Sequence, residues 1–364
     1  MTRLSFIALI CLVGPAHAFA QTGVDCASAT VGLDFDGDSD PQATQFLLGR
    51  YGCGAVTLKL KAVLEDDDLE LKVQEAFVQT NLGEALSLTF GKAIATYDKS
   101  QFFRPLDVVQ SDRLNFDIRD TSGALAGLPQ VAIAHFGGSA TTRFLFSSDF
   151  KNEPDGANQG LDQVVMSHAG FAGGADYELV ARYAEGNINT FSLGVAASTA
   201  LNDFALSYGT IIFQRDVRRF DKRAALATAG ALGSADDTWF PQFALGVTVN
   251  PPFDPSLSLT LEAFHDGTGL TESEWVAIGG GFGPLPYLRQ NYLGISAQRS
   301  FGIVDGTLSE IYNVDDGSSN IRLGIHFERS GFDVNIVREW SIGETGDEFV
   351  SGDMKTILEM RFDL

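Results

Sequence analysis

The residues best suited to chemistry lie in one long stretch between positions 96 and 128. Acidic and basic side chains alternate there with aromatic ones: Arg104, Asp107, Asp112, Arg113, Asp117 and Arg119 among Tyr97, Phe102, Phe103 and Phe116. Opposed charges that line a narrow passage set up a transverse field, which orders dipolar solutes. The alternative is an exposed loop with its charges in water. We expect the stretch to fold into the interior of the protein, because its aromatic residues would otherwise be exposed to solvent.

A second candidate for chemistry is a run of alternating aspartates. Asp34, Asp36 and Asp38 have the spacing of a calcium-binding loop, and hard divalent cations prefer several converging carboxylate oxygens. However, Ser39 stands where such a loop has glycine, and Gln45 stands where it has its final glutamate. The pattern therefore favours an acidic rim over a Ca²⁺ site, and no other cofactor is indicated.

His265 followed by Asp266 is the one candidate for hydrolytic catalysis. Such a pair needs a serine nucleophile nearby, and the sequence does not indicate which serine, if any, would be that nucleophile. No histidine has a metal-ligand spacing such as H-E-x-x-H. We therefore expect no enzymatic activity.

The first 20 residues have the layout of a secretory signal: Arg3, the apolar run 6–13, then small residues suitable for cleavage. The apolar run is too short to span a bilayer, and no later stretch reaches the roughly 20 apolar residues of a transmembrane helix. The chain has 25 Lys and Arg against 47 Asp and Glu, a net charge of -22. This balance excludes nucleic acid as a partner, because phosphates would be repelled.

Two cysteines remain after residue 20, Cys26 and Cys53, and disulfides persist in exported proteins. Strands expected at 30–35 and 44–51 would form a hairpin that brings these cysteines opposite each other at its base. We therefore expect a disulfide between Cys26 and Cys53. Two free thiols in turns are the alternative.

Apolar and polar side chains alternate along almost the entire chain after the signal, and this period of two is typical of strands with one apolar face. The predicted strands lie near 30–35, 44–51, 55–65, 69–81, 85–95, 129–137, 140–149, 163–172, 176–184, 189–200, 203–214, 240–250, 256–266, 288–300, 302–314, 319–330, 332–341 and 353–364. The runs 69–81 and 302–314 change phase midway, which predicts bulges. The chain is thus predicted to be all-β: one domain, 21–364, forming a transmembrane antiparallel up-and-down β-barrel of 16 to 18 strands.

The connections between these strands alternate between short and long. Short ones such as 83–84 and 173–174 are followed by long ones such as 96–128 and 215–239, so every long connection falls at the same end. Outer-membrane barrels have short periplasmic turns and longer outer loops, with the C-terminus at the periplasmic end. One outer loop holds a basic run that could bind lipopolysaccharide phosphates, funnel anions or simply be solvated: Arg215, Arg218, Arg219, Lys222 and Arg223. Another could hold a short helix at 270–278.

The inward faces of the predicted strands are polar, with Lys59, Lys61, Glu178, Arg182, Glu262, Arg322, Glu328, Glu359, Arg361 and Asp363. Barrels of about 16 to 18 strands leave a water-filled lumen. A polar bore of mixed charge indicates passive diffusion of small hydrophilic solutes or ions. The acidic balance of the chain predicts a cation preference, which the inward lysines and arginines could reverse.

Together, the export signal, the sorted loops and the terminal strand make the chain resemble porins of Gram-negative bacteria over its whole length after the signal. Residues 86–112 (LSLTFGKAIATYDKSQFFRPLDVVQSD) are also similar to a strand and loop with an Asp-Val-Val element in porin-like barrels. The resemblance implies an outer-membrane location among lipid and lipopolysaccharide, insertion by the barrel-assembly machinery, and a homotrimer. The alternatives are a hydrolase at the barrel mouth, and a structural or adhesive barrel whose outer loops bind partners.

Overall fold

A computed structural model describes residues 27–36, 42–53, 55–65, 68–95, 97–106, 128–147, 162–185, 190–215, 239–277, 288–329, 332–349 and 354–363. Side chains are described for all of these except 27–36, 42–53, 61–65, 68–72, 128, 277, 354–355, 359 and 361–363. The predicted export signal lies outside these ranges. Within them, no helix is long and apolar enough to cross a membrane.

The described part of the chain forms eighteen strands in the order in which the alternating pattern predicts them. Predicted and observed strands agree to within a few residues at their ends. The bounds are β1 (Ala27–Asp36), β2 (Gln42–Cys53), β3 (Val56–Glu65), β4 (Asp68–Asn81), β5 (Leu86–Ala93), β6 (Leu128–Gly137), β7 (Ala140–Ser147), β8 (Asp162–Ala172), β9 (Ala175–Glu185), β10 (Thr190–Asn202), β11 (Ala205–Arg215), β12 (Trp239–Val249), β13 (Leu257–Asp266), β14 (Asn291–Ser300), β15 (Val304–Asn313), β16 (Ser319–Arg329), β17 (Phe332–Ile342) and β18 (Met354–Asp363).

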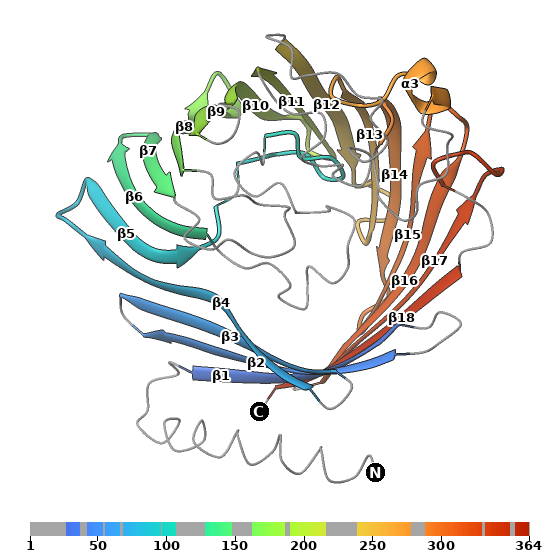
Figure 1. Ribbon diagram of the computed structural model, residues 1–364, viewed down its shortest axis with the longest axis horizontal. Helices are drawn as coiled ribbons and strands as arrows, with labels where there is room; N and C mark the ends of the chain where they lie inside the picture. Colours follow the sequence, from blue (N-terminus) through green and yellow to red (C-terminus); the bar gives the residue numbers. More distant parts are fainter. Residues whose placement is uncertain are drawn as a thin grey trace.

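All eighteen strands belong to one antiparallel sheet that closes on itself. Each strand pairs with the strands before and after it in sequence, and β1 pairs with both β2 and β18. Thr30 of β1 lies opposite Asp363 of β18, so the first and last described strands meet at one seam. Figure 1 shows the strands arranged in a ring around a central space. The predicted up-and-down barrel is confirmed, with the larger of the two expected strand numbers.

Side chains on the two faces of the sheet differ as the alternation predicts. On β8, Val164 and Met166 are exposed on the outside of the ring, whereas the intervening Val165 and Ser167 are buried. Phe243 and Leu245 of β12 are likewise exposed. A contiguous apolar outer surface of this extent is stable when hydrocarbon surrounds it.

One of the two predicted bulges is present. Lys59 pairs with Glu75 whereas Leu60 pairs with Val73, so Gln74 is an extra residue in β4. The second prediction, at 302–314, is wrong, because β15 keeps continuous register with both neighbours. Gly302, with a φ of 87°, belongs to the turn before β15. The change of phase arises within β15: Glu310 lies on the outer face, opposite Ile295, and Ile311 is buried on the inner face in the cluster around Phe102 and Phe103.

The two ends of the barrel differ in their connections. At one end, here the short-turn end, the chain passes between strands through residues 54–55, 82–85, 138–139, 173–174, 203–204, 250–256, 301–303 and 330–331. At the other, the long-loop end, the connections are 37–41, 66–67, 94–127, 148–161, 186–189, 216–238, 267–290, 314–318 and 343–353. The connection 66–67 departs from the predicted sorting, and 250–256 at the short-turn end is longer than 37–41, 186–189 and 314–318 at the other end. Exposed phenylalanines at or beside the short turns, such as Phe171, Phe204 and Phe301, suit a membrane interface.

Two of the long connections are fastened to each other at the long-loop end. The predicted short helix is present as α3 (Glu272–Ala277), and Glu274 accepts a hydrogen bond from the backbone N of Thr271 just before the helix, as in a capping box. The indole of Trp275 donates to the carbonyl of Gly346 (2.8 Å) in the connection after β17. The Glu348 carboxylate accepts from the Tyr292 hydroxyl at 2.7 Å. This end of β13 to β17 is therefore held rigidly around the opening.

Candidate functional site: a segment docked inside the barrel

Residues 97–106, called the docked segment below, leave the sheet after β5 and lie inside the ring of strands (Figure 1, teal). They are the described part of the 96–128 stretch. Tyr97, Phe102, Phe103 and Leu106 are all buried against inward-facing side chains of the barrel. The described aromatic residues of this stretch, Tyr97, Phe102 and Phe103, thus lie within the protein.

A single carboxylate of the barrel wall holds the centre of the docked segment. Glu262, in β13, is completely buried. Its oxygens accept hydrogen bonds from the backbone N of Gln101 (2.8 Å), Phe102 (3.2 Å) and Phe103 (2.8 Å). The Tyr208 hydroxyl of β11 donates a fourth at 2.8 Å. Four donors compensate the loss of hydration that burying a carboxylate costs.

A second carboxylate closes the docked segment on itself. Asp98 accepts from the backbone N of Ser100 (2.9 Å) and of Leu106 (2.6 Å), which fixes the turn between them. Asp98 also accepts from the Thr210 hydroxyl at 2.7 Å, and Ser100 contacts the same hydroxyl at 3.1 Å. The segment is therefore tied to β11 as well as to β13.

Apolar contacts complete the docking in two clusters. Around Tyr97 and Leu106 lie buried side chains of β6 to β11: Ala132, Leu145, Val165, Val180, Ala196 and Ile212. Phe103 stacks on Phe264 of β13, with ring centroids 4.6 Å apart, and contacts Tyr292 at 5.9 Å. Burying such side chains stabilises a structure by roughly 1.5–3 kcal/mol each. One part of the inner wall is therefore packed like a protein core.

Glycines in the wall make room for the docked segment. A Cβ at Gly194 would lie 2.5 Å from the Leu106 side chain, and one at Gly294 would lie 2.7 Å from the ring of Phe102. Gly246 and Gly294 are the two register partners of Glu262 on β12 and β14. The anchoring carboxylate thus stands between two positions without side chains, which lets the Tyr208 ring and the Phe102 ring approach it.

Other strands carry charged pairs on the same inner face. Arg322 of β16 contacts Glu339 of β17 at 2.9 Å, and Lys59 of β3 lies 3.8 Å from Glu75 of β4. On β9, the Arg182 Nε donates to the side-chain oxygen of Gln163 at 2.7 Å. Basic and acidic groups thus both face the interior, as the sequence predicts.

The remaining predicted site residues fall into three groups. Arg104 belongs to the docked segment and is partly buried, while Glu328 is exposed on the inner face near the short-turn end. Lys61, Arg361, Asp34 and Asp36 lie in described strands, but their side chains are not described. Outside the described residues lie Asp107, Asp112, Arg113, Asp117, Arg119, Asp38, Arg218, Arg219, Lys222, Arg223 and Cys26. Within the described part of the chain, no cluster of His, Cys, Asp and Glu could hold a metal ion.

The predicted disulfide between Cys26 and Cys53 is tested only in its surroundings. Ala27 of β1 pairs with Tyr51 of β2, so the expected hairpin is present up to its base. Cys26 itself lies outside the described residues, and the disulfide stays a prediction.

His265 and Asp266 do not form a catalytic pair. As neighbours in one strand they point to opposite faces of the sheet. His265 stacks on the outward Phe243 and contacts Asn291 at 2.9 Å, whereas Asp266 is buried and accepts from Gln242 at 2.6 Å. This geometry does not favour the alternative of a hydrolase acting through these two residues.

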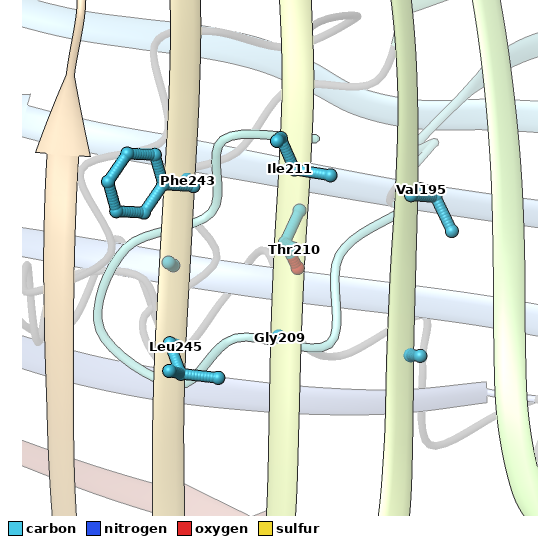
Figure 2. Close-up of a pocket in the computed structure, with 8 residues that line it drawn as sticks. Val195, Gly209, Thr210, Ile211, Phe243 and Leu245 are labelled. Carbon is cyan, nitrogen blue, oxygen red and sulfur yellow. The ribbon is translucent and has the colours of Figure 1, made fainter.

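The outer face of the docking strands has one shallow apolar groove. Gly209 leaves a gap of about 360 Å³ between side chains that include Val195, Ile211, Phe243 and Leu245. Figure 2 views these side chains from outside, with Thr210 pointing through the sheet to the far side. The groove belongs to the apolar outer surface, and its lining is suited to alkyl chains.

No protein-family model matches this chain, and no curated protein matches its sequence. Solved structures are similar in three dimensions. OccK11 (OpdR) of Pseudomonas aeruginosa has a TM-score of 0.57 at 12% identity, covering 93% of this chain and 95% of that chain. OccAB3 of Acinetobacter baumannii has a TM-score of 0.51 at 11% identity, covering 93% and 98%.

A third similar structure is Wzi of Escherichia coli, with a TM-score of 0.57 at 10% identity, covering 93% of this chain and 84% of that chain. Wzi is described as an outer membrane protein involved in group 1 capsule assembly and as a carbohydrate-binding β-barrel. At these identities the similarity concerns the architecture. The closed sheet, the sorted connections and these alignments together give this chain the fold of the outer-membrane porins, as its sequence resemblance predicts.

Proposed function

We propose that this chain is a porin, a passive channel for small hydrophilic solutes or ions in the outer membrane of a Gram-negative bacterium. A closed cylinder of eighteen strands is wide enough to enclose a water-filled lumen. Its apolar outside suits hydrocarbon, and its inner face carries ion pairs such as Arg322 with Glu339. The fold shared with porins supports the same conclusion.

The observation that carries the proposal is the docked segment. A chain that only had to fill its barrel could do so with side chains from the strands. Here a loop from the long-loop end lies against one part of the wall through Glu262 and Asp98. We infer that the whole 96–128 stretch narrows the lumen, with Arg104, Asp107, Asp112, Arg113, Asp117 and Arg119 as constriction residues. Solutes would pass between this stretch and the remaining wall.

Several finer properties belong to the same proposal. Net charge suggests a preference for cations, but the paired charges of both signs on the inner face make the selectivity a property of the lumen. Homotrimer formation, insertion by the barrel-assembly machinery, and contacts of the basic run at 215–223 with lipopolysaccharide stay predictions.

Single-channel recording in planar bilayers tests the function. The refolded chain should conduct in discrete steps, and deletion of residues 100–120 should raise the conductance of each step, because the constriction is removed. Insertion of both proteins is checked by their heat-dependent migration on gels. Absence of conductance from the inserted wild-type chain would refute the channel, whereas equal conductance of both proteins would refute the constriction alone.

A further inference from the structure

His326 differs from the other described histidines in the face of the sheet on which it lies. His135, His168 and His265 occupy the same face of their strands as exposed apolar residues such as Ile133, which surround the barrel. On β16 the exposed residues are Leu323 and Ile325, so His326 points to the inside. Histidine is the side chain whose charge ordinarily changes between about pH 5 and 8.

Both ring nitrogens of His326 face carboxylates from the two neighbouring strands. The Nε2 atom lies 2.9 Å from an oxygen of Asp333 on β17, at hydrogen-bond distance. The Nδ1 atom lies 3.8 Å from an oxygen of Asp305 on β15. Only the protonated imidazole carries an N–H on both nitrogens. A neutral ring would donate to one carboxylate and turn a lone pair toward the other.

The surroundings of His326 are otherwise acidic or neutral. Besides Asp305, β15 places Thr307 on this face, and β17 places Asn335 beside Asp333. On β16 itself, the next inward residue toward the short-turn end is Glu328. The nearest inward arginine of β16, Arg322, is already engaged by Glu339. On β18, Arg361 is the register partner of Asp333. Protonation of His326 therefore adds one positive charge to an acidic patch in which no other cation on β15 to β17 faces it.

We propose that His326 is a selectivity-determining residue of the channel, and that its protonation sets how strongly the short-turn end of the lumen favours cations. The inference rests on the proposed channel function. When His326 is protonated, it neutralises one carboxylate and bridges β15 to β17. When it is neutral, His326 no longer offsets the negative charge of Asp305 and Asp333, and the patch attracts cations more strongly. The side chains of all three residues are about one third exposed, so solvent and ions reach them.

Reversal potentials in a potassium chloride gradient test this inference. Between pH 5.5 and pH 8.0, the potassium-to-chloride permeability ratio of the wild type should rise by up to about sevenfold, because one unit charge at about 7 Å in water changes the two permeabilities by about threefold in opposite directions. The variant His326→Asn should lose most of this rise. His135→Asn, on the outer face, is the matched control and should behave like the wild type.

A second variant tests the carboxylates independently. Replacing both Asp305 and Asp333 with Asn should lower the cation preference at pH 8.0, because the groups that His326 balances are gone. A pH-dependent permeability ratio that persists unchanged in His326→Asn would overturn the inference while leaving the channel intact. A wild-type protein that inserts but does not conduct would instead remove the channel itself, and the selectivity role with it.

Discussion

Two parts of the inner wall use the same strand geometry for opposite purposes. The strands β10 to β14 present glycines, apolar side chains and the buried carboxylates Glu262 and Asp266, and they bind the docked segment through Glu262. The strands β15 to β17 present paired charges at their middle and short-turn end, such as Arg322 with Glu339. In the first part Glu262 accepts hydrogen bonds from three backbone N–H groups and from the buried Tyr208 hydroxyl. In the second the partners are ionised side chains that solvent reaches.

This difference between the two parts of the inner wall indicates where the rigidity of the barrel comes from. A buried carboxylate with four donors is expensive to disturb, because losing any donor or the acceptor leaves buried polar groups without partners. Partly exposed ion pairs contribute about 0–1 kcal/mol and can be exchanged with little loss of stability. The wall formed by β10 to β14, called the docked wall, is therefore suited to fix the shape of the lumen. The wall formed by β15 to β17, called the charged wall, is suited to tune the electrostatic potential inside it.

The largest expected effect comes from removing the anchor. Glu262→Gln keeps the shape of the side chain but replaces an accepting oxygen by a donor, which should cost about 2–4 kcal/mol in docking free energy. The docked segment should loosen, so that trypsin cleaves after Lys99 and single-channel conductance rises or fluctuates. Glu185→Gln, at an exposed strand end, is the control. Tryptic resistance equal to that of the wild type would show that Glu262 is not the anchor.

The next largest effect is a difference in stability between alanine substitutions at two glycines of the inner face. In Gly294→Ala the new methyl would lie 2.7 Å from the Phe102 ring, so the packed segment must shift at a cost of about 1–3 kcal/mol. In Gly324→Ala, on the charged wall, the nearest atom would be 3.7 Å away, and the change should be neutral or stabilising by up to about 1 kcal/mol. Urea unfolding midpoints in lipid vesicles measure both. Equal destabilisation by the two substitutions would remove the distinction between the walls.

The smallest expected effect concerns the ion pair of the charged wall. Arg322→Gln should raise the potassium-to-chloride permeability ratio about twofold and Glu339→Gln should lower it by a similar factor, because each leaves one charge facing the lumen. The double variant should return close to the wild type. Each single variant should unfold at a lower urea concentration than the double variant, because the two side chains are only 16% and 20% exposed and the remaining charge loses its partner. Reversal potentials provide the measurement, and a double variant that differs as much as either single one would contradict the pairing.

The strands could be predicted because membrane and lumen impose opposite polarity on successive residues, as Leu323 and Arg322 illustrate. The inward position of Glu262 and Arg322 followed from the same rule. The role of Glu262 did not follow, because its partners are backbone groups of residues about 160 positions earlier in the chain. Gly246 and Gly294 were the available signal, but they are recognised only once strand register places them beside Glu262.

The sequence pattern was also misleading where the wall is covered. Inward positions such as Leu145, Val165 and Ile212 are apolar, whereas a water-filled bore predicts polar residues there. Each of them contacts the cluster around Tyr97 and Leu106. Alternation reports the environment of each face, and a face covered by another part of the same chain is indistinguishable from one that faces lipid.

The seam between β1 and β18 makes assembly an all-or-nothing event. Hydrogen bonds such as those around Thr30 and Asp363 join the earliest strand to the latest, so the cylinder cannot close before the final strand has been supplied. A chain interrupted before β18 would expose the unpaired backbone groups of two edge strands to hydrocarbon, which offers no hydrogen-bond partners. Such a fragment has no route to a smaller pore, and degradation or aggregation would be its fate.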